Sequence, residues 1–196
     1  MRKSIFLPLL VLFCLGCSNH PTAPSRPLTF QERLLASKPV QQLNQRGLVP
    51  DWSKAERKSF LFGPGTVAPL PDHGLIVLVA RDTLDNIGGF IFVPGNNILD
   101  PRVTLESPDG LHRAEIGHDN KLMSVWHSPL STAVDNDQWD QFFDCVIDEI
   151  GTHPNWVNIG CGFSIIGCGA SGNFVLCLAG VICAVDYLKD CVHWLW

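Results

Sequence analysis

The stretch RVTLESPDGLHRAEI, residues 102–116, is the clearest β-hairpin signal in the chain. Two runs in which polar and apolar residues alternate, 102–106 and 111–116, flank the tetrapeptide Ser-Pro-Asp-Gly, whose composition is typical of a tight turn. Alternation with a period of two predicts strands that are exposed on one face. The stretch therefore predicts antiparallel β-structure in the middle of the chain.

Three further strands are predicted around this hairpin. The apolar run at residues 75–80 and the run at 89–93 are typical of buried strands, and the run at 122–127 follows the hairpin. The connections are short and contain no helical pattern, which favours a meander of antiparallel strands. We therefore expect an antiparallel β module over residues 73–130.

The first residues predict export. Arg2 and Lys3 precede an apolar segment, residues 5–15, which is shorter than the roughly 20 residues that a transmembrane helix needs. This pattern is typical of a secretory signal peptide, here residues 1–16. The small residue before Cys17 resembles the lipobox of bacterial lipoproteins, and the alternative is an ordinary signal peptide with an incidental cysteine.

The lipobox resemblance implies that cleavage leaves Cys17 as the first residue and that acyl chains, palmitate among them, are attached to it. Such chains anchor a protein through their buried methylene groups. The expected location is a membrane surface that faces the periplasm or the cell exterior, and the expected partner is membrane lipid.

Residues 17–72 are expected to link this anchor to the β module as a Pro-rich tether with one or two short helices. Thr29 and Glu32 have the spacing of a capping box, which predicts a short helix, and a second helix can follow before Gly47. Prolines and glycines recur over residues 48–72 and favour a connector on the surface.

Residues 135–196 are expected to form a helical module rich in cysteine. Apolar side chains recur at helical spacing over residues 135–150, and Asp135 or Asp137 can cap this helix. The following segment, residues 154–185, has no charged side chain and is punctuated by glycines. Whether this segment binds a nucleotide, spans a membrane or forms disulfide-linked helices determines which functions the sequence favours.

Six cysteines lie in this C-terminal module: Cys145, Cys161, Cys168, Cys177, Cys183 and Cys191. An even number of cysteines, clustered in an exported protein, is typical of a disulfide framework, and the sequence leaves the pairing open. Their spacing lacks the close C-x2-C pair that zinc sites favour. We therefore predict disulfides and no metal site.

The glycine pattern G-x-G-x-x-G at residues 167–172 has three interpretations. A dinucleotide loop would need a preceding βαβ context, which the sequence does not provide. A membrane span would need about 20 unbroken apolar residues, and Gly-Ala-Ser-Gly-Asn at 169–173 interrupts the run. Two short helices joined at 169–173 fit best. The predicted fold class is α+β, a small antiparallel meander followed by a disulfide-stapled α-helical module.

The stretch GCGASGNFVLCL, residues 167–178, resembles the microhalocins, small cysteine-rich antimicrobial peptides released from the C-terminal end of a longer exported precursor. The resemblance covers residues 155–196 and implies a bacteriocin-like module that acts on a target-cell membrane. Trp194 and Trp196 are candidates for the lipid–water boundary, with core packing as their alternative role. The second hypothesis is a non-enzymatic surface lipoprotein with a binding or structural ectodomain.

The chain is acidic, which argues against nucleic acid as a partner. Its formal charge of −5 becomes −7 when Arg2 and Lys3 leave with the signal peptide, and no basic cluster remains. Neither G-x-S-x-G nor H-E-x-x-H is present, so no enzyme activity and no cofactor are predicted.

A single concentration of ligand-type side chains lies at a predicted strand end and comprises His112, Glu115, His118 and Asp119. Polar side chains exposed to solvent are expected at such a position, so we predict no metal or catalytic role for them.

Overall fold

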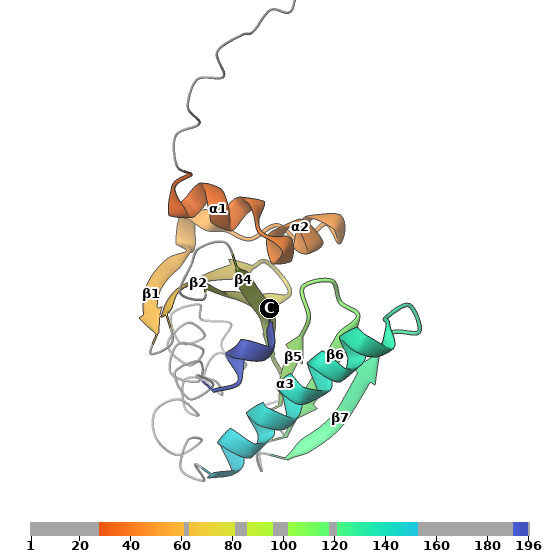
Figure 1. Cartoon of the computed structure of the whole chain (residues 1–196). Coiled ribbons are helices and arrows are strands. Elements are labelled where there is room, and N and C mark those ends of the chain that lie inside the picture. Colours follow the sequence, from red (N-terminus) through yellow and green to blue (C-terminus); the bar gives the residue numbers. More distant parts are fainter. Residues whose placement is uncertain are drawn as a thin grey trace, which may run out of the picture.

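The computed structural model describes residues 28–60, 63–80, 86–95, 102–117, 121–152 and 190–195. Within these residues, seven strands form one antiparallel sheet in the order β1-β2-β3-β4-β5-β6-β7, so each strand pairs with its neighbours along the chain. Helices α1 and α2 cover one face of the sheet, and α3 and η2 lie on the other (Figure 1). The fold class is α+β with an antiparallel meander, as the sequence predicted.

The strands are β1 (Glu56–Phe60), β2 (Gly63–Leu70), β3 (Gly74–Ala80), β4 (Ile87–Pro94), β5 (Val103–Glu106), β6 (His112–Ile116) and β7 (Leu122–His127). The helices are α1 (Phe30–Ala36), α2 (Lys38–Gln45) and α3 (Ala133–Thr152), with the 3-10 turns η1 (Trp52–Lys54) and η2 (Val192–Leu195). Strands β3 to β7 confirm the five predicted strands, and α1 and α2 confirm the two short helices. The predicted pair of helices in the glycine-rich segment lies outside the described residues.

The expectation of a surface connector over residues 48–72 is wrong, because this segment forms β1 and β2. The prolines and glycines of β2 are typical of turns, yet Val67 and Ala68 are fully buried. Pro69 lies beyond Val67, the last residue of β2 that pairs with β1, so one side of the strand needs no donor there. Two strands thus extend the sheet beyond the predicted β module.

The central strands β3 and β4 are buried on both faces of the sheet. Val77 and Phe90 pack with Phe142 of α3 in one core, whereas Ile76 packs with Leu43 of α2 in the other. All these side chains are at most 1% exposed. Burial on both sides explains why β3 is a continuous apolar run rather than an alternating one.

Capping interactions explain where the helices begin. In α1, Thr29 and Glu32 form the predicted capping box, and the Thr29 N–H donates to the Glu32 carboxylate at 2.8 Å. The predicted cap of α3 at Asp135 or Asp137 is wrong, because the helix begins earlier. The Thr132 hydroxyl accepts from the Asp135 N–H at 3.1 Å and donates to the Asp135 carboxylate at 2.6 Å.

Among the described residues, no helix combines the length and hydropathy needed to cross a membrane.

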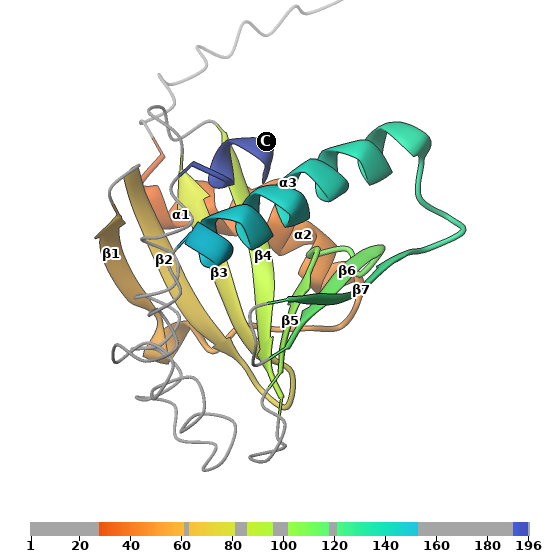
Figure 2. The same cartoon turned by 90° about the horizontal axis from the view of Figure 1, so that it is seen from below.

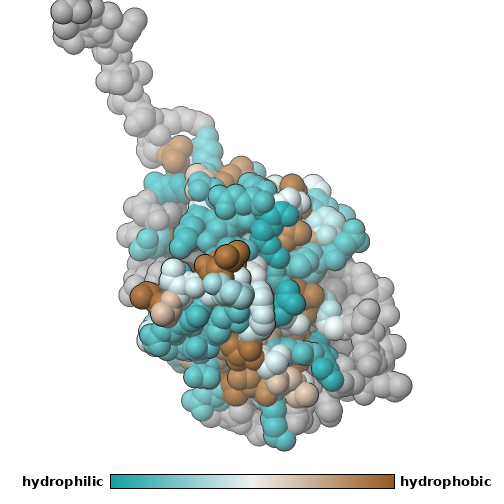
Figure 3. Space-filling model, turned by 90° about the vertical axis from the view of Figure 1, so that its right-hand side faces the viewer, coloured by the Kyte–Doolittle hydropathy of each residue, from teal (hydrophilic) through white to brown (hydrophobic). Residues whose placement is uncertain are grey.

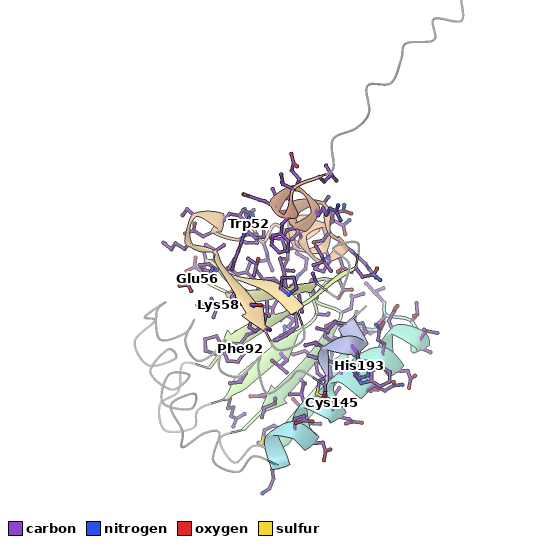
Figure 4. The ribbon with its side chains drawn as sticks, turned by 60° about the vertical axis from the view of Figure 1, so that its left-hand side comes forward. Trp52, Glu56, Lys58, Phe92, Cys145 and His193 are labelled. Carbon is purple, nitrogen blue, oxygen red and sulfur yellow. A yellow bond between two sulfur atoms is a disulfide. The ribbon has the colours of Figure 1, made fainter. Side chains whose placement is uncertain are left out.

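A disulfide joins Cys145 of α3 to Cys191, just before η2, with Cα atoms 5.5 Å apart. Cys191 and Val192 are buried in the core beneath the sheet. Figure 4 shows Cys145 and the labelled His193 of η2 next to each other at the face covered by α3. The other four cysteines of the predicted framework lie outside the described residues.

The strand β7 is one edge of the sheet, and side chains on both of its faces are exposed. Met123 and Trp126 are about half exposed, and Leu130 in the connection to α3 and Val134 in the first turn of α3 are more exposed still. The surface on this side is largely hydrophilic, with separate apolar patches (Figure 3).

Candidate functional site

The sheet opens between β4 and β5. Residues 91–94 of β4 pair with β5, which ends at Glu106 opposite Ile91, whereas residues 87–90 pair with β3 alone (Figure 2). Helices flank this opening from both faces. The result is a cleft with a cavity volume of about 480 Å³.

The cleft is lined by residues from both ends of the described chain. Arg33, Lys38 and Gln42 come from α1 and α2, whereas Trp194 and Leu195 come from η2. The sheet and α3 complete the lining with Asn86, Ile87, Gly89, Pro108, Asp109, His112, Asp135, Gln138 and Trp139. Elements that are distant in sequence must therefore fold together before the cleft exists.

At the floor of the cleft, Gly89 of β4 lies too close to β3 to carry a side chain. A Cβ atom there would lie 2.8 Å from Leu78 Cδ2 and 2.9 Å from the carbonyl oxygen of Val77. The same Cβ would lie 3.4 Å from Pro39, near the start of α2. Any side chain at this position would overlap with neighbouring backbone atoms, so only glycine fits here.

His112, the first residue of β6, is the buried polar group of the cleft. Its residue surface is 1% exposed, and its ring stacks on Trp139 with centroids 5.5 Å apart. Its backbone N–H donates to the Ser107 hydroxyl at 3.0 Å. The expectation that His112 is exposed at a strand end is wrong, because α3 covers this end of β6.

A chain of three side chains leads from the cleft toward the surface. Nδ1 of His112 lies 2.9 Å from Nδ1 of His127, and Nε2 of His127 lies 2.9 Å from the Asp140 carboxylate. The two histidines are direct partners in the β6–β7 register, and Asp140 comes from α3. Asp140 is about half exposed, so this series of hydrogen-bonded side chains runs from His112 in the cleft to solvent at Asp140.

The tautomers follow from this chain when both rings are neutral. A carboxylate can only accept, so Nε2 of His127 carries the proton that it donates to Asp140. Nδ1 of His127 then accepts from the N–H at Nδ1 of His112. Nε2 of His112 is left without a proton, and it has no hydrogen-bond partner among the described residues. His112 therefore offers a hydrogen-bond acceptor to the cleft.

Burial lowers the pKa of His112 below its ordinary value, because the imidazolium loses hydration, and the neighbouring His127 acts in the same direction. The carboxylates of Asp109, Asp135 and Asp140 oppose this shift without overcoming it. His112 is therefore neutral at pH 7, as the tautomer assignment requires.

The β5–β6 turn is held in place by polar contacts to α2. Asp109 accepts from the Gln42 side chain at 3.1 Å and from the Leu111 N–H at 3.0 Å. Arg46 donates to the Pro108 carbonyl at 3.1 Å and pairs with the buried carboxylate of Glu106. These contacts fix one wall of the cleft against the helix that forms the next wall.

The remaining predicted site residues have separate positions. Glu115 pairs with Arg102 at 2.9 Å, away from the lining of the cleft, and His118 and Asp119 lie outside the described residues. Trp194 is partly buried against the core and accepts from Gln138 through its carbonyl at 2.6 Å. Cys17 and Trp196 also lie outside the described residues, so their roles stay predictions.

His127, Trp139 and Asp140 are site residues that no sequence pattern predicted. In the parts of the chain that the structure describes, no group of three or more histidine, cysteine or carboxylate side chains could hold a metal ion. Comparison of the chain with protein-family models, with curated proteins and with solved structures found no match. The cleft is therefore the feature of the molecule that indicates a function.

Proposed function

We propose that the chain is an exported lipoprotein, anchored through Cys17, and that its folded ectodomain binds a ligand in the cleft without catalysing a reaction. The observation that carries this proposal is the composition of the lining, which joins residues of α1 and α2 to residues of α3 and η2. Ligand sites are typically preformed concave surfaces with a few convergent polar groups on an apolar lining. The cleft is concave and polar groups from several elements converge on it, while aromatic and aliphatic side chains supply about half of its lining.

The packing of the C-terminal residues supports a single folded ectodomain. Phe142, Phe143 and Val146 of α3 are at most 1% exposed and belong to the core that β3 and β4 line. Cys191 is buried in the same core and is bonded to Cys145. A cut between residues 153 and 189 would therefore leave the C-terminal end attached to α3.

The alternative is a bacteriocin-like module, residues 135–196, that acts on a target-cell membrane. It rests on the uncharged segment 154–185 and on the resemblance to the microhalocins. Release of the module would remove α3 from the sheet and expose Phe90 and Phe142, whose tilted rings contact each other with centroids 5.5 Å apart. Exposure of such a core is unfavourable by about 25 cal/mol per Å2 of apolar surface. The geometry thus favours the ectodomain.

Mass spectrometry of the exported protein, before and after limited proteolysis without reducing agent, tests this choice. We expect an acylated N-terminus at Cys17 and a protected fragment that contains α1 through α3 together with η2. A free peptide that begins between residues 135 and 155 would instead support the bacteriocin-like module.

Ligand binding in the cleft is tested by NMR titration of the ectodomain with a library of small organic fragments. We expect shifts at the Trp194 indole and at the Gly89 amide, both of which line the cleft. Ala36→Phe narrows the cleft, because Ala36 is part of its lining, and should abolish these shifts. Leu35→Phe is the matched control, since Leu35 is 42% exposed on the same helix and does not line the cleft. No binding by any fragment would contradict the proposal.

A further inference from the structure

We propose that the cleft binds an uncharged, hydroxyl-bearing ligand of the saccharide class, and that a ligand hydroxyl donates a hydrogen bond to Nε2 of His112. The inference rests on the proposed function, because it names the ligand of the same cleft. Four properties of the lining carry it: its charge balance, its amides, its aromatic rings and the acceptor of His112.

The charges of the lining cancel. Arg33 and Lys38 contribute two cations, and Asp109 and Asp135 contribute two carboxylates. Lys38 acts electrostatically on Asp135, and Asp109 already accepts hydrogen bonds from its own turn and from Gln42. The cleft therefore presents no electrostatic field of a single sign that would attract a charged ligand. Neutral groups that hydrogen-bond in both directions are the better match.

Amides supply most of the neutral polar side chains of the cleft, and Ser37 adds a hydroxyl. Gln42, Asn86 and Gln138 each carry both a donor and an acceptor group. A hydroxyl group has the same dual character, since it donates one hydrogen bond and accepts others. A ligand with several hydroxyls can therefore use amides and charged groups of either sign at the same time.

Aromatic and aliphatic surface supplies the other half of the lining. Trp139 and Trp194 contribute indole rings, and Ile87 and Leu195 contribute aliphatic side chains. Trp139 is held between His112, at 5.5 Å, and Phe143, at 5.6 Å between centroids, so its ring is fixed before a ligand arrives. The C–H face of a sugar ring packs on such a surface while its hydroxyls point to polar groups.

His112 adds a requirement for a donor. The hydrogen-bond chain through His127 to Asp140 engages Nδ1 of His112, so the unprotonated Nε2 is the ring atom that can accept a hydrogen bond from a ligand. A buried acceptor that stays unpaired in a complex costs about 1–3 kcal/mol, so ligands without a donor are disfavoured at this position. The arrangement selects a hydroxyl over an ether or a methyl group, as hydrogen-bonding sites do.

Binding should also respond to acid. Protonation of His112 turns the acceptor into a donor and places a cation in the cleft, so affinity should fall at a pH below the ordinary histidine range. The groups that face His112 are Asp109 of the turn, His127 of β7 and, from α3, Asp135 and Asp140. The charge of Asp140 favours protonated His112, so its removal should move the loss of affinity to lower pH.

The test is an NMR titration of the whole ectodomain at pH 7.5 with maltotriose, cellotriose and chitotriose, each neutral, and with trigalacturonate as a charged analogue of similar size. We expect at least one neutral trisaccharide to bind, trigalacturonate to bind at least tenfold more weakly, and the 15N resonance of His112 Nε2 to shift. Binding should disappear in Ala36→Phe and persist in Leu35→Phe.

Two variants test the role of the chain behind His112. Asp140→Asn keeps an oxygen acceptor for His127 but removes the charge, so the pH at which acid lowers the affinity should move to a lower value. Asp144→Asn is the matched control, because Asp144 is an exposed carboxylate on the same helix, and its pH profile should equal that of the wild type. Identical profiles for wild type and Asp140→Asn would overturn the role of the chain.

The remaining outcomes separate this inference from the proposed function. If fragments bind at the cleft but no neutral trisaccharide does, or if trigalacturonate or an uncharged hexapeptide binds more tightly, the saccharide class is wrong and the binding ectodomain stands. If neither fragments nor saccharides shift the Trp194 and Gly89 signals, both proposals fail.

Discussion

The guanidinium of Arg46, at the C-terminal end of α2, forms an ion pair with the carboxylate of Glu106, the last residue of β5. The side chain of Glu106 is only 2% exposed. Arg46 also donates to the carbonyl oxygens of Ser107 at 3.3 Å and Pro108 at 3.1 Å. One cation thereby neutralises a buried carboxylate and holds the β5–β6 turn against α2.

Substitution Arg46→Met should lower the free energy of unfolding by about 3 kcal/mol, because it leaves the Glu106 carboxylate buried with too few partners. Arg113→Met is the control. Arg113 contacts the same carboxylate at 3.1 Å, but its side chain is 52% exposed, so we expect a loss of about 1 kcal/mol or less. Urea unfolding measures the loss in free energy of unfolding for both variants. Equal losses would show that the burial of the arginine side chain does not determine how much its ion pair stabilises the fold.

Replacement of both Cys145 and Cys191 by alanine should destabilise the fold. The bond links positions 46 residues apart, and the chain-entropy estimate for a loop of this length is about 4 kcal/mol. Urea unfolding under oxidising conditions measures the loss, and Val134→Ala serves as a control, since Val134 is 78% exposed on α3. A loss below 1 kcal/mol would mean that noncovalent packing alone holds η2 in place.

Stability should fall as the pH drops through about 6.5, the ordinary pKa of histidine, because of His112. The folded state lowers the pKa of His112, so below pH 6.5 the unfolded chain binds a proton that the folded chain does not. The loss should level off once the pH is below the folded pKa. His112→Gln should flatten this dependence in urea unfolding between pH 8 and pH 5, whereas His193→Gln, at an exposed position, should not.

Substitution Gly89→Ala should cost about 2 kcal/mol, the range typical of overpacking. The new methyl group would lie 2.8 Å from Leu78 and 2.9 Å from the Val77 carbonyl, and the latter cannot move without the sheet. Gly47→Ala is the comparison, because a Cβ at Gly47 meets nothing within 4 Å and its cost comes from a φ of +74° alone. Thermal unfolding distinguishes them, and a neutral Gly89→Ala would show that β3 can shift at Val77 and Leu78.

Local patterns were sufficient to predict much of the fold. The Ser-Pro-Asp-Gly turn between alternating runs predicted β5 and β6, and the spacing of Thr29 and Glu32 predicted the start of α1. The strand β2 could not be predicted in this way, because its prolines and glycines are tolerated only through the positions of β1 and β3 around it. Tertiary context determined that strand.

The site was less predictable than the fold. Pairing the two predicted strands end to end would place His112 opposite Trp126, and an irregularity between Glu115 and Ile116 shifts the register by one residue, so the lengths of the strands do not predict the His112–His127 pair. Asp140 could not be predicted either, because its contact depends on how α3 crosses the sheet. Trp139 was assigned only to the apolar stripe of α3, yet the same ring lines the cleft and stacks on His112.

The order of the strands has a consequence for how the molecule is assembled during synthesis. Every β-ladder joins neighbours in sequence, so the sheet can grow strand by strand as the chain emerges. The core on the α3 side of the sheet also contains Cys191, which follows all seven strands and α3 in the sequence. The sheet and α3 can therefore assemble before Cys191 emerges, and its bond to Cys145 then locks a core that is already covered.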